Sequence, residues 1–369
     1  MKRFLCAVFA AALLLTQMPT VSAVGTSASS SILMDGNSGR ILYEQNAHER
    51  RLIASITKLM TALVALESEH ALGEKVTIAP AWAGAEGSSI YLQPGEQVTL
   101  ETLLYGMLLR SGNDAALAVA GYCGGDVETF VAKMNEKARQ LGMTDSHFSN
   151  PNGLNAEDHY STAYDMALLA RACLDNETLA GMVSTKSITL GTRLFTNHNK
   201  LLWQYESCIG LKTGFTEKAG RTLVSAAKRD GLTLICVTLN DPNDWADHEA
   251  LFDYGFEHYK AEPLAAEGET LCRLPVSGGL IPFCPAVAET SAALCLAPGE
   301  TVRRELKLGT PALFAPVSAG SRVGEAVYYL NDKEILRISL VAGTSISNVL
   351  APKQRLLEQL RERLAALSG

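Results

Sequence analysis

The spacing of hydrophobic residues changes along the 369-residue chain, and the order of these changes limits the folds that it can adopt. Two short strand-like segments come first, helical spacing dominates as far as residue 174, and strand-like alternation returns from residue 188. The expected segments are a hairpin at 31–46, helices at 57–66, 100–109, 115–120, 127–141, 166–174 and 244–256, and strands at 208–215, 221–227 and 232–239. This order predicts an α/β (α+β) domain, residues 24–262, in which helices pack on an antiparallel sheet.

Beyond Pro263 the chain is rich in Gly, Pro, Val and Thr, with short alternating runs such as 301–308 and 334–341. This pattern predicts a second domain, a small β-sandwich at 263–348. The last part, 349–369, is again helical, with leucines on one face and more basic than acidic side chains. A basic amphipathic helix of this kind can lie on an anionic membrane surface. The alternatives are that it packs on its own domain or contacts a partner.

The N-terminus predicts an export signal. Lys2 and Arg3 are basic, residues 4–15 are apolar, and Val21-Ser22-Ala23 has the small residues of a cleavage site. These features predict a secretory signal peptide at 1–23. A retained membrane anchor is the alternative, but the apolar run is too short to span a bilayer. The sequence therefore predicts an exported protein.

Charge and cysteine content argue against several kinds of protein. The net charge is −7 and the body of the chain has no Lys/Arg-rich run, so no nucleic-acid partner is predicted. Seven cysteines remain once Cys6 leaves with the signal, so at least one thiol is unpaired, and mostly buried free thiols are expected. Cys-x-x-Cys and His-Glu-x-x-His patterns are absent. We therefore predict no metal site and no cofactor.

Three short motifs follow one another in the first domain: Ser55-x-x-Lys58, Ser111-x-Asn113 and Lys212-Thr213-Gly214. The first is expected in the first turn of a helix, where residues three apart lie on one face. A hydroxyl beside an amine near a helix N-terminus is a workable nucleophile and base. The same spacing recurs at Ser225-x-x-Lys228, but the other two motifs do not follow it. We assign that second pair to a strand.

Cleavage of a peptide bond by a serine needs a nucleophile, a base, an oxyanion site and a proton donor for the leaving amine. We predict Ser55 as the nucleophile and Lys58 as the base. The pKa of Lys58 has to be lowered, which burial and the second cation, Lys212, would both do. Ser111 is placed to relay a proton to the leaving nitrogen, and Asn113 can hold the substrate amide.

The third motif suits a substrate that ends in a free carboxylate. Lys212 offers a charge and Thr213 a hydrogen bond. Gly214 lacks a side chain, so a substrate backbone can lie along this strand. The pattern therefore predicts cleavage at a chain end. His198 could also bind the carboxylate, although a purely structural role fits it equally well.

The three motifs, in this order, are those of the penicillin-recognising serine acyl-transferases. Longer segments resemble the D-alanyl-D-alanine carboxypeptidases among the low-molecular-weight penicillin-binding proteins, peptidase family S11. The segments that carry this resemblance are Ile32-Leu33-Met34-Asp35, Leu42-Tyr43-Glu44-Gln45-Asn46-Ala47, Ala54-Ser55-Ile56-Thr57-Lys58, Ser111-Gly112-Asn113-Asp114-Ala115-Ala116, Gly142-Met143-Thr144, Asn150-Pro151-Asn152-Gly153-Leu154 and His159-Tyr160-Ser161-Thr162-Ala163. The resemblance covers roughly residues 30–260, and the two-domain layout, signal peptide and amphipathic tail are also similar to that family.

The resemblance implies a penicillin-recognising serine transpeptidase-like fold and removal of the terminal D-alanine from peptidoglycan stem peptides ending in D-Ala-D-Ala, through an acyl-enzyme on Ser55. It also implies that the backbone N–H groups of Ser55 and Phe215 bind the oxyanion, and that β-lactams are covalent inhibitors. The expected location is the outer face of the cytoplasmic membrane or the cell wall. A β-lactamase is an alternative, but no Glu-x-x-x-Asn loop lies between residues 140 and 190. The other alternative is an inactive wall-binding scaffold. The presence of all the motif side chains argues against it.

Overall fold

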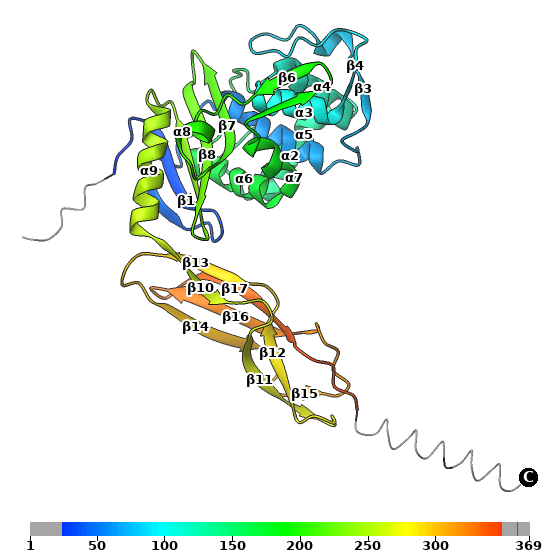
Figure 1. The fold of residues 1–369 in the computed structure, drawn as a ribbon, viewed down its shortest axis with the longest axis vertical. Helices are drawn as coiled ribbons and strands as arrows, with labels where there is room; N and C mark the ends of the chain where they lie inside the picture. The colour runs from blue at the N-terminus through cyan, green and yellow to red at the C-terminus, as the bar shows by residue number, and fades with distance from the viewer. Residues whose placement is uncertain (1–23, 349–359, 361–369) are drawn as a thin grey trace, which may run out of the picture.

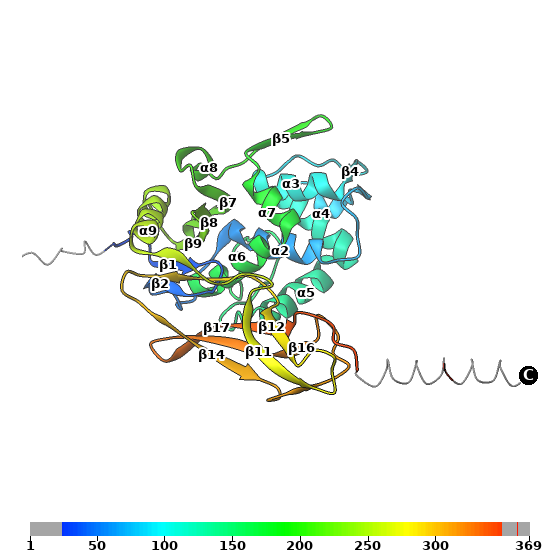
Figure 2. The ribbon, with the colours of Figure 1, turned by 60° about the horizontal axis from the view of Figure 1, so that its bottom comes forward.

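The structure is a computed structural model that describes residues 24–348 and Leu360. In Figure 1 a larger domain of helices and strands lies above a smaller domain built of strands, and Figure 2 shows the same two parts from a second direction. The predicted signal peptide, 1–23, lies outside the described residues. So does the predicted amphipathic tail apart from Leu360, which is helical and exposed.

A five-stranded antiparallel sheet forms the centre of the larger domain, in the order β2-β1-β9-β8-β7. Its strands are β1 (Ser30–Asp35), β2 (Ile41–Gln45), β7 (Cys208–Thr216), β8 (Gly220–Arg229) and β9 (Leu232–Leu239). Ile32 pairs with Glu44 on one side and with Val237 on the other, so the first hairpin joins strands that come much later in the chain. The predicted hairpin and strands are confirmed. Strand β7 lies at one edge of this sheet.

Helices cover both faces of the sheet. The helical segments of this domain are the 3-10 turn η1 (Ala54–Thr57), α2 (Lys58–Leu66), α3 (Leu100–Leu109), α4 (Asn113–Gly124), α5 (Val127–Gln140), α6 (Ala163–Asp175), α7 (Glu177–Ser184), α8 (Leu201–Gln204) and α9 (Asp244–His258). Helix α9 lies on one face, and α6 with the cluster around α2 lies on the other (Figure 1). Because both faces are covered, every residue of β1 is buried. The sequence did not predict α7 or α8.

Side-chain caps fix where several helices begin. In each case an oxygen of the residue before the helix accepts a hydrogen bond from the backbone N–H three residues later, which satisfies a donor that the helix leaves free. The caps are Thr99 for α3, Asp126 for α5, Thr162 for α6 and Asn176 for α7. Helix α6 begins at Ala163, earlier than the expected residue 166, because Thr162 is its cap.

Two small hairpins extend from the helical side of the larger domain. They are formed by β3 (Lys75–Thr77) with β4 (Gln97–Thr99) and by β5 (Ser187–Leu190) with β6 (Arg193–Thr196), and the short turn η2 (Pro80–Trp82) follows β3. Arg193 joins the hairpins, since its guanidinium pairs with Glu96 at 2.6 Å and donates to the carbonyl of Ile90. The long loop between β3 and β4 is therefore tied to the β5–β6 hairpin.

The smaller domain consists of two sheets packed around one core, as the predicted β-rich domain requires. A two-stranded sheet pairs β10 with β13, and a six-stranded sheet has the order β14-β16-β17-β12-β11-β15. The strands are β10 (Lys260–Ala265), β11 (Thr270–Ser277), β12 (Phe283–Ala288), β13 (Ala292–Leu296), β14 (Val302–Leu308), β15 (Leu313–Phe314), β16 (Arg322–Leu330) and β17 (Lys333–Ala342). Ala265 and Ala292 of the small sheet share a core with Leu274 and Leu340 of the large one.

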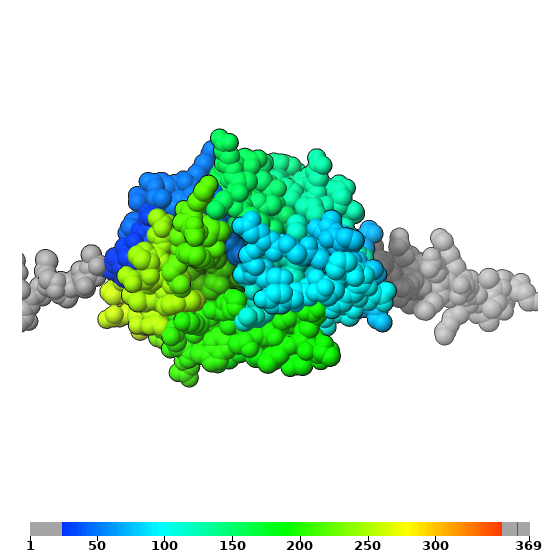
Figure 3. Space-filling view, turned by 90° about the horizontal axis from the view of Figure 1, so that it is seen from above, coloured from blue at the N-terminus to red at the C-terminus, as the bar shows by residue number. Residues whose placement is uncertain are grey.

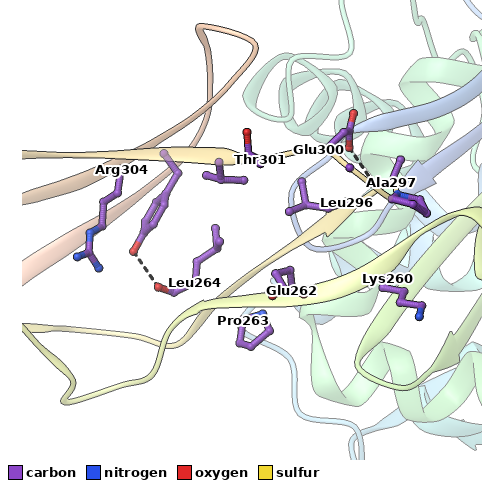
Figure 4. A pocket seen from close by; sticks show the side chains of 13 residues that line it. Lys260, Glu262, Pro263, Leu264, Leu296, Ala297, Glu300, Thr301 and Arg304 are labelled. Carbon is purple, nitrogen blue, oxygen red and sulfur yellow. Dashed lines mark hydrogen bonds between the residues drawn. The ribbon is translucent and has the colours of Figure 1, made fainter.

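The junction between the domains is a strand pair and an ion pair. The predicted boundary after Glu262 falls inside β10, which starts two residues after the end of α9. Arg40 of the larger domain binds both carboxylate oxygens of Glu300 at 2.7 Å and donates to the carbonyl of Cys295. A cavity of about 680 Å³ lies beside this junction, between β10 and the start of β14 (Figure 4).

The described part of the chain can also be searched for disulfides, membrane-spanning helices and metal-binding groups. All seven described cysteines are free, five of them buried, in agreement with the expected buried thiols. Among residues 24–348 and Leu360, no helix is long and apolar enough to cross a membrane. The same residues contain no group of three or more His, Cys, Asp or Glu side chains that could hold a metal ion.

Candidate active site

Ser55 lies in the 3-10 turn η1, directly before α2. We expected it in the first α-helical turn. The α-helix instead begins at Lys58. Ala54, directly before Ser55, has a positive φ of 49° that right-handed helical backbone does not allow. The predicted contact is nevertheless made, since Lys58 Nζ lies 2.8 Å from Ser55 Oγ.

A chain of hydrogen bonds holds the strained backbone of this turn. The Thr57 hydroxyl donates to the carbonyl of Ala54 at 2.8 Å and lies 2.8 Å from Nε2 of His159. Nδ1 of His159 accepts from the N–H of Ser149, so Nε2 carries the proton and donates to Thr57. Burial lowers the pKa of His159 to about 4, so the ring is neutral near pH 7. The segment around residue 150 therefore fixes the turn that presents Ser55.

Two glycines lie in close contact with the backbone of the Ser55 turn. A Cβ on Gly153, whose φ is +85°, would lie 2.0 Å from the carbonyl oxygen of Ala54. A Cβ on Gly214 of β7 would lie 2.9 Å from the backbone nitrogen of Ser55 and 2.4 Å from Oγ1 of Thr222. Side chains at either position would push the turn or the strand away. The sequence had pointed to Gly214 as a site residue, whereas Gly153 stood out only as part of a segment that carries the family resemblance.

Replacing Gly153 with alanine is expected to destabilise the protein by about 2–4 kcal/mol, since the methyl group has no room beside Ala54. Gly142→Ala is the matched control, because Gly142 has a similar φ of +75° but no atom within 4 Å of the added Cβ. It should cost only about 1–2 kcal/mol, the usual penalty for a Cβ in left-handed backbone. Urea unfolding of both variants measures the difference. Equal losses would show that backbone conformation alone, and not the contact with Ala54, requires Gly153.

Lys58 is fully buried and makes three hydrogen bonds. Its Nζ contacts Ser55 Oγ at 2.8 Å, Asn113 Oδ1 at 2.7 Å and the carbonyl oxygen of Asn152 at 2.5 Å. Burial lowers the pKa of Lys58 well below its usual value, and the positive charge of Lys212 lowers it further. Both causes that the sequence predicted are therefore present.

The partners of Lys58 determine what its amine can do when it is neutral. A neutral amine has two N–H donors and one lone pair. The two carbonyl oxygens, Asn113 Oδ1 and Asn152 O, can only accept, so they take the two N–H groups. The lone pair is left facing the Ser55 hydroxyl, which can then donate. This arrangement suits removal of a proton from Ser55.

The turn between α3 and α4 carries the second motif. Ser111 adopts a positive φ of 62°, and Asn113 is the first residue of α4. Asn113 is held twice by the β3–β4 loop, through its N–H to the carbonyl of Ser88 at 2.7 Å and through Nδ2 to the carbonyl of Glu86 at 2.6 Å. Its side-chain oxygen contacts Lys58, so one amide hydrogen is left for a substrate. Asn113 thereby also positions Lys58, a role that its residue type did not reveal.

The third motif lies on the edge strand β7. Lys212 is almost fully buried, donates to the carbonyl of Thr213 at 2.8 Å, and has a pKa lowered to about 7 by burial. Thr213, Gly214 and Phe215 line the cavity in front of the strand, and Phe215 is 63% exposed. An edge strand has free backbone groups along its outer side, so an extended peptide can pair with it.

One cavity of about 380 Å³ brings these groups together. Of the predicted residues, Ser55, Ser111, Thr213, Gly214 and Phe215 line it, while Lys58, Asn113 and Lys212 lie buried behind them. It lies on the face of the larger domain seen from above in Figure 3, where the cyan β3–β4 loop meets the green segments of β5 to β8. The three motifs, which are far apart in the sequence, therefore form one site.

Several lining residues were not predicted. Ser88 comes from the β3–β4 loop, Lys200 precedes α8, and Arg221, Asp244 and Trp245 come from β8 and the start of α9. The carbonyl of Asn152 is a further group that the sequence did not single out. A backbone carbonyl leaves no side-chain pattern. The other residues come from a loop, from helix ends and from the neighbouring strand β8, and only the tertiary fold brings them to the cavity.

His198 and Ser225 are the two residues for which the sequence offered both a functional and a structural role. His198 lines the cavity, and burial, with the charges of Lys212 and Arg110, lowers its pKa to about 4. It is neutral near pH 7, so it could bind a carboxylate only by a hydrogen bond. Ser225 lies in β8, as expected, and its hydroxyl contacts Nδ1 of the buried His248. The second Ser-x-x-Lys pair is therefore part of the sheet.

Comparison with known sequences identifies relatives over nearly the whole chain. Residues 17–243 match the family model of peptidase S11, described as D-alanyl-D-alanine carboxypeptidase. The chain is 32% identical to the D-alanyl-D-alanine carboxypeptidase DacF of Bacillus subtilis over 93% of its own length and 94% of that protein. It is 33% identical to DacA of Escherichia coli, a carboxypeptidase of the same name, over 88% of its own length and 85% of that protein.

Solved structures agree with the sequence relatives. Penicillin-binding protein 5 of Haemophilus influenzae matches with a TM-score of 0.75 and 28% identity, over 89% of this chain and all of that one. A peptidoglycan synthesis regulatory factor (PBP3) of Streptococcus pneumoniae matches with a TM-score of 0.79 and 26% identity, over 88% of this chain and all of that one. Both similarities span the α/β domain and the β-rich domain. With the family match covering more than half of its length, the chain belongs to the D-alanyl-D-alanine carboxypeptidases of peptidase family S11.

Proposed function

We propose that this protein removes the terminal D-alanine from peptidoglycan stem peptides that end in D-Ala-D-Ala, through an acyl-enzyme on Ser55. The observation that carries the proposal is the buried Lys58 amine, 2.8 Å from Ser55 Oγ, with its other hydrogen bonds taken by carbonyl oxygens. A lysine whose pKa is lowered well below its usual value can be neutral and accept the proton of the serine hydroxyl beside it.

In the acylation step, neutral Lys58 takes the Ser55 proton as Oγ attacks the carbonyl carbon of the penultimate residue. The oxyanion is bound by the backbone N–H groups of Ser55 and Phe215, and losing one such donor typically slows a reaction by about 10²- to 10³-fold. Collapse of the tetrahedral intermediate breaks the peptide bond. The proton passes through Ser111 to the nitrogen of the leaving D-alanine. Water then hydrolyses the ester, with Lys58 again taking a proton.

The substrate lies against the outer edge of β7. Gly214 leaves room for its backbone, and the free amide hydrogen of Asn113 holds its amide carbonyl. The hydroxyl of Thr213 lines the cavity and binds the terminal carboxylate, while buried Lys212 contributes positive charge from behind the strand. A substrate without a C-terminal carboxylate would lose both interactions. This accounts for cleavage at a chain end.

The segments predicted at residues 1–23 and 349–369 support a place of action outside the cytoplasm. The signal peptide predicted at 1–23 exports the protein, and the substrate lies in the cell wall. The basic amphipathic helix predicted at 349–369 holds the protein at the outer face of the cytoplasmic membrane by lying on anionic lipid. β-Lactams act as covalent inhibitors by acylating Ser55.

Labelled penicillin tests the proposal on the purified mature protein. We expect a covalent adduct that is lost slowly, and release of D-alanine from a peptide ending in D-Ala-D-Ala. Ser55→Ala should abolish both, whereas the matched control Ser225→Ala, which changes the other Ser-x-x-Lys pair, should keep both per folded molecule. Rapid turnover of penicillin without a lasting adduct would indicate a β-lactamase. If the wild type forms no adduct and releases no D-alanine, the protein is an inactive scaffold and the proposed function is wrong.

A further inference from the structure

The cavity in front of Ser55 has a charged wall that the three motifs do not supply. Arg221 of β8 lines it together with Asp244 and Trp245, the first two residues of α9. The Arg221 Nη2 lies 2.8 Å from Asp244 Oδ1, and the guanidinium carbon lies 5.4 Å from the centre of the Trp245 ring. These contacts hold a cation at the side of the cavity.

Strand register places Arg221 beside the third motif. Arg221 pairs with Phe215 across β7 and β8, and Thr213 pairs with Leu223 two positions further along. Side chains two residues apart on a strand lie on the same face, so Thr213, Phe215 and Arg221 share one face of the sheet. All three line the same cavity as Ser55. A group bound to the Thr213 hydroxyl therefore lies on the side of the sheet from which Arg221 approaches.

Arg221 is held firmly but retains free donors. Asp244 is only 3% exposed in its side chain and also accepts the N–H of Trp245, so its position is fixed. It engages one guanidinium nitrogen, and the Arg221 side chain remains 41% exposed. A guanidinium has five N–H donors in a planar fork that matches a carboxylate. A side chain already fixed by an ion pair and a ring loses little entropy when it binds an anion.

The other cations near the cavity are less suited to binding an anion directly. Lys212 is 1% exposed, and its pKa of about 7 leaves a large fraction uncharged near neutral pH. His198 is neutral at that pH. Lys200 is exposed, and its ammonium sits on a flexible stem. Arg221 is already oriented by Asp244 and Trp245.

We propose that Arg221 is a specificity-determining residue that binds the C-terminal carboxylate of the substrate together with the Thr213 hydroxyl, and that Asp244 and Trp245 orient it. The inference rests on the proposed carboxypeptidase function. Arg221 would contact the carboxylate directly, whereas buried Lys212 acts on it only through its charge. A penicillin carries a carboxylate next to its reactive ring, so the same contact assists acylation by β-lactams.

The test compares substrates that differ only at the chain end. Release of the last residue is measured for a peptide ending in free D-Ala-D-Ala and for the same peptide with a C-terminal amide. In parallel, the rate of Ser55 acylation is measured with a penicillin and with its methyl ester. Arg221→Gln should lower kcat/KM for the free acid and acylation by the penicillin by about 10- to 100-fold, mainly through KM for the peptide. The amide and the ester should change less than about twofold. For the free acid and the penicillin, the rates of Arg221→Lys should lie between those of the wild type and those of Arg221→Gln.

Arg229→Gln is the matched control, because Arg229 lies on the same strand but packs on Phe256 and Tyr205, outside the cavity. It should leave all four rates unchanged. Equal losses on acid and neutral substrates in Arg221→Gln, or a selective loss in Lys200→Gln but not in Arg221→Gln, would overturn the assignment. A wild-type protein that neither releases D-alanine nor forms an adduct would instead contradict the proposed function.

Discussion

Replacement of Lys58 by methionine is expected to slow acylation of Ser55 by roughly 10⁴-fold while leaving the fold intact. Methionine fills a similar volume in the fully buried site but has no lone pair to accept the Ser55 proton. The stability cost should be small, because the variant also removes the need to bury an amine. Rapid-mixing measurements with a chromogenic penicillin give the acylation rate, and urea unfolding gives the stability.

The pH profile separates loss of a base from general damage. Burial, and to a smaller extent the charge of Lys212, lower the pKa of Lys58. The amine is therefore mostly neutral at pH values above that lowered pKa. Wild-type acylation should therefore fall as the pH drops through it, because the protonated amine has no lone pair. The residual rate of Lys58→Met should lack this acid limb. A variant with wild-type rates, or one that keeps the same limb, would show that another group is the base.

Removal of the Asp114 carboxylate is expected to lower the free energy of unfolding by about 3–5 kcal/mol. Asp114 is completely buried and accepts hydrogen bonds from the Ser89 hydroxyl and from the N–H groups of Ile90, Leu92 and Ala115, at 2.6–3.0 Å. Asp114→Ala leaves these donors without an acceptor. Urea unfolding of the variant measures the loss.

The same substitution should also weaken substrate binding. The loop that Asp114 holds contains Ser88, which lines the cavity, and Glu86, whose carbonyl holds Asn113. We expect an increased KM and slower acylation in the fraction that stays folded. Asp126→Ala is the control, since Asp126 is an exposed cap of α5 and should cost only about 1 kcal/mol without affecting KM. If the two variants lose similar stability, the buried carboxylate does not organise the loop.

The elements with strong periodic patterns were predictable from the sequence. Helix α3 has the predicted bounds, Leu100–Leu109, because a continuous apolar pattern starts directly after the cap Thr99. The strands β7 to β9 were found from their alternation. Helix α7 was missed because it has only eight residues and follows α6 directly, with Asn176 as the cap between them. A two-turn helix has too few apolar positions to define a period.

The site was predictable as far as side chains define it. Ser55 and Lys58 meet because their spacing brings residues to one side of a helical turn, even though that turn is 3-10. The Asn152 carbonyl could not be predicted, because every residue has one. Asp114 follows the second motif directly in the sequence. Its role in holding the β3–β4 loop could not be predicted, because it depends on backbone N–H groups of that loop. Arg221 enters the cavity only because the β7–β8 register places it opposite Phe215.

The hydrogen bonds of Lys58 also decide when the protein becomes reactive during folding. Its partners Asn113 and Asn152 lie 55 and 94 residues away in the sequence, and Gly214, which abuts Ser55, comes later still. Contacts between such distant segments close large loops and form slowly. A nascent chain that emerges with its N-terminus first contains Ser55 long before the Lys58 amine is buried and held by its hydrogen-bond partners. We expect such a chain to be unreactive and Ser55 to be acylated only after the edge strand β7 has docked. Covalent labelling would then report when refolding is complete.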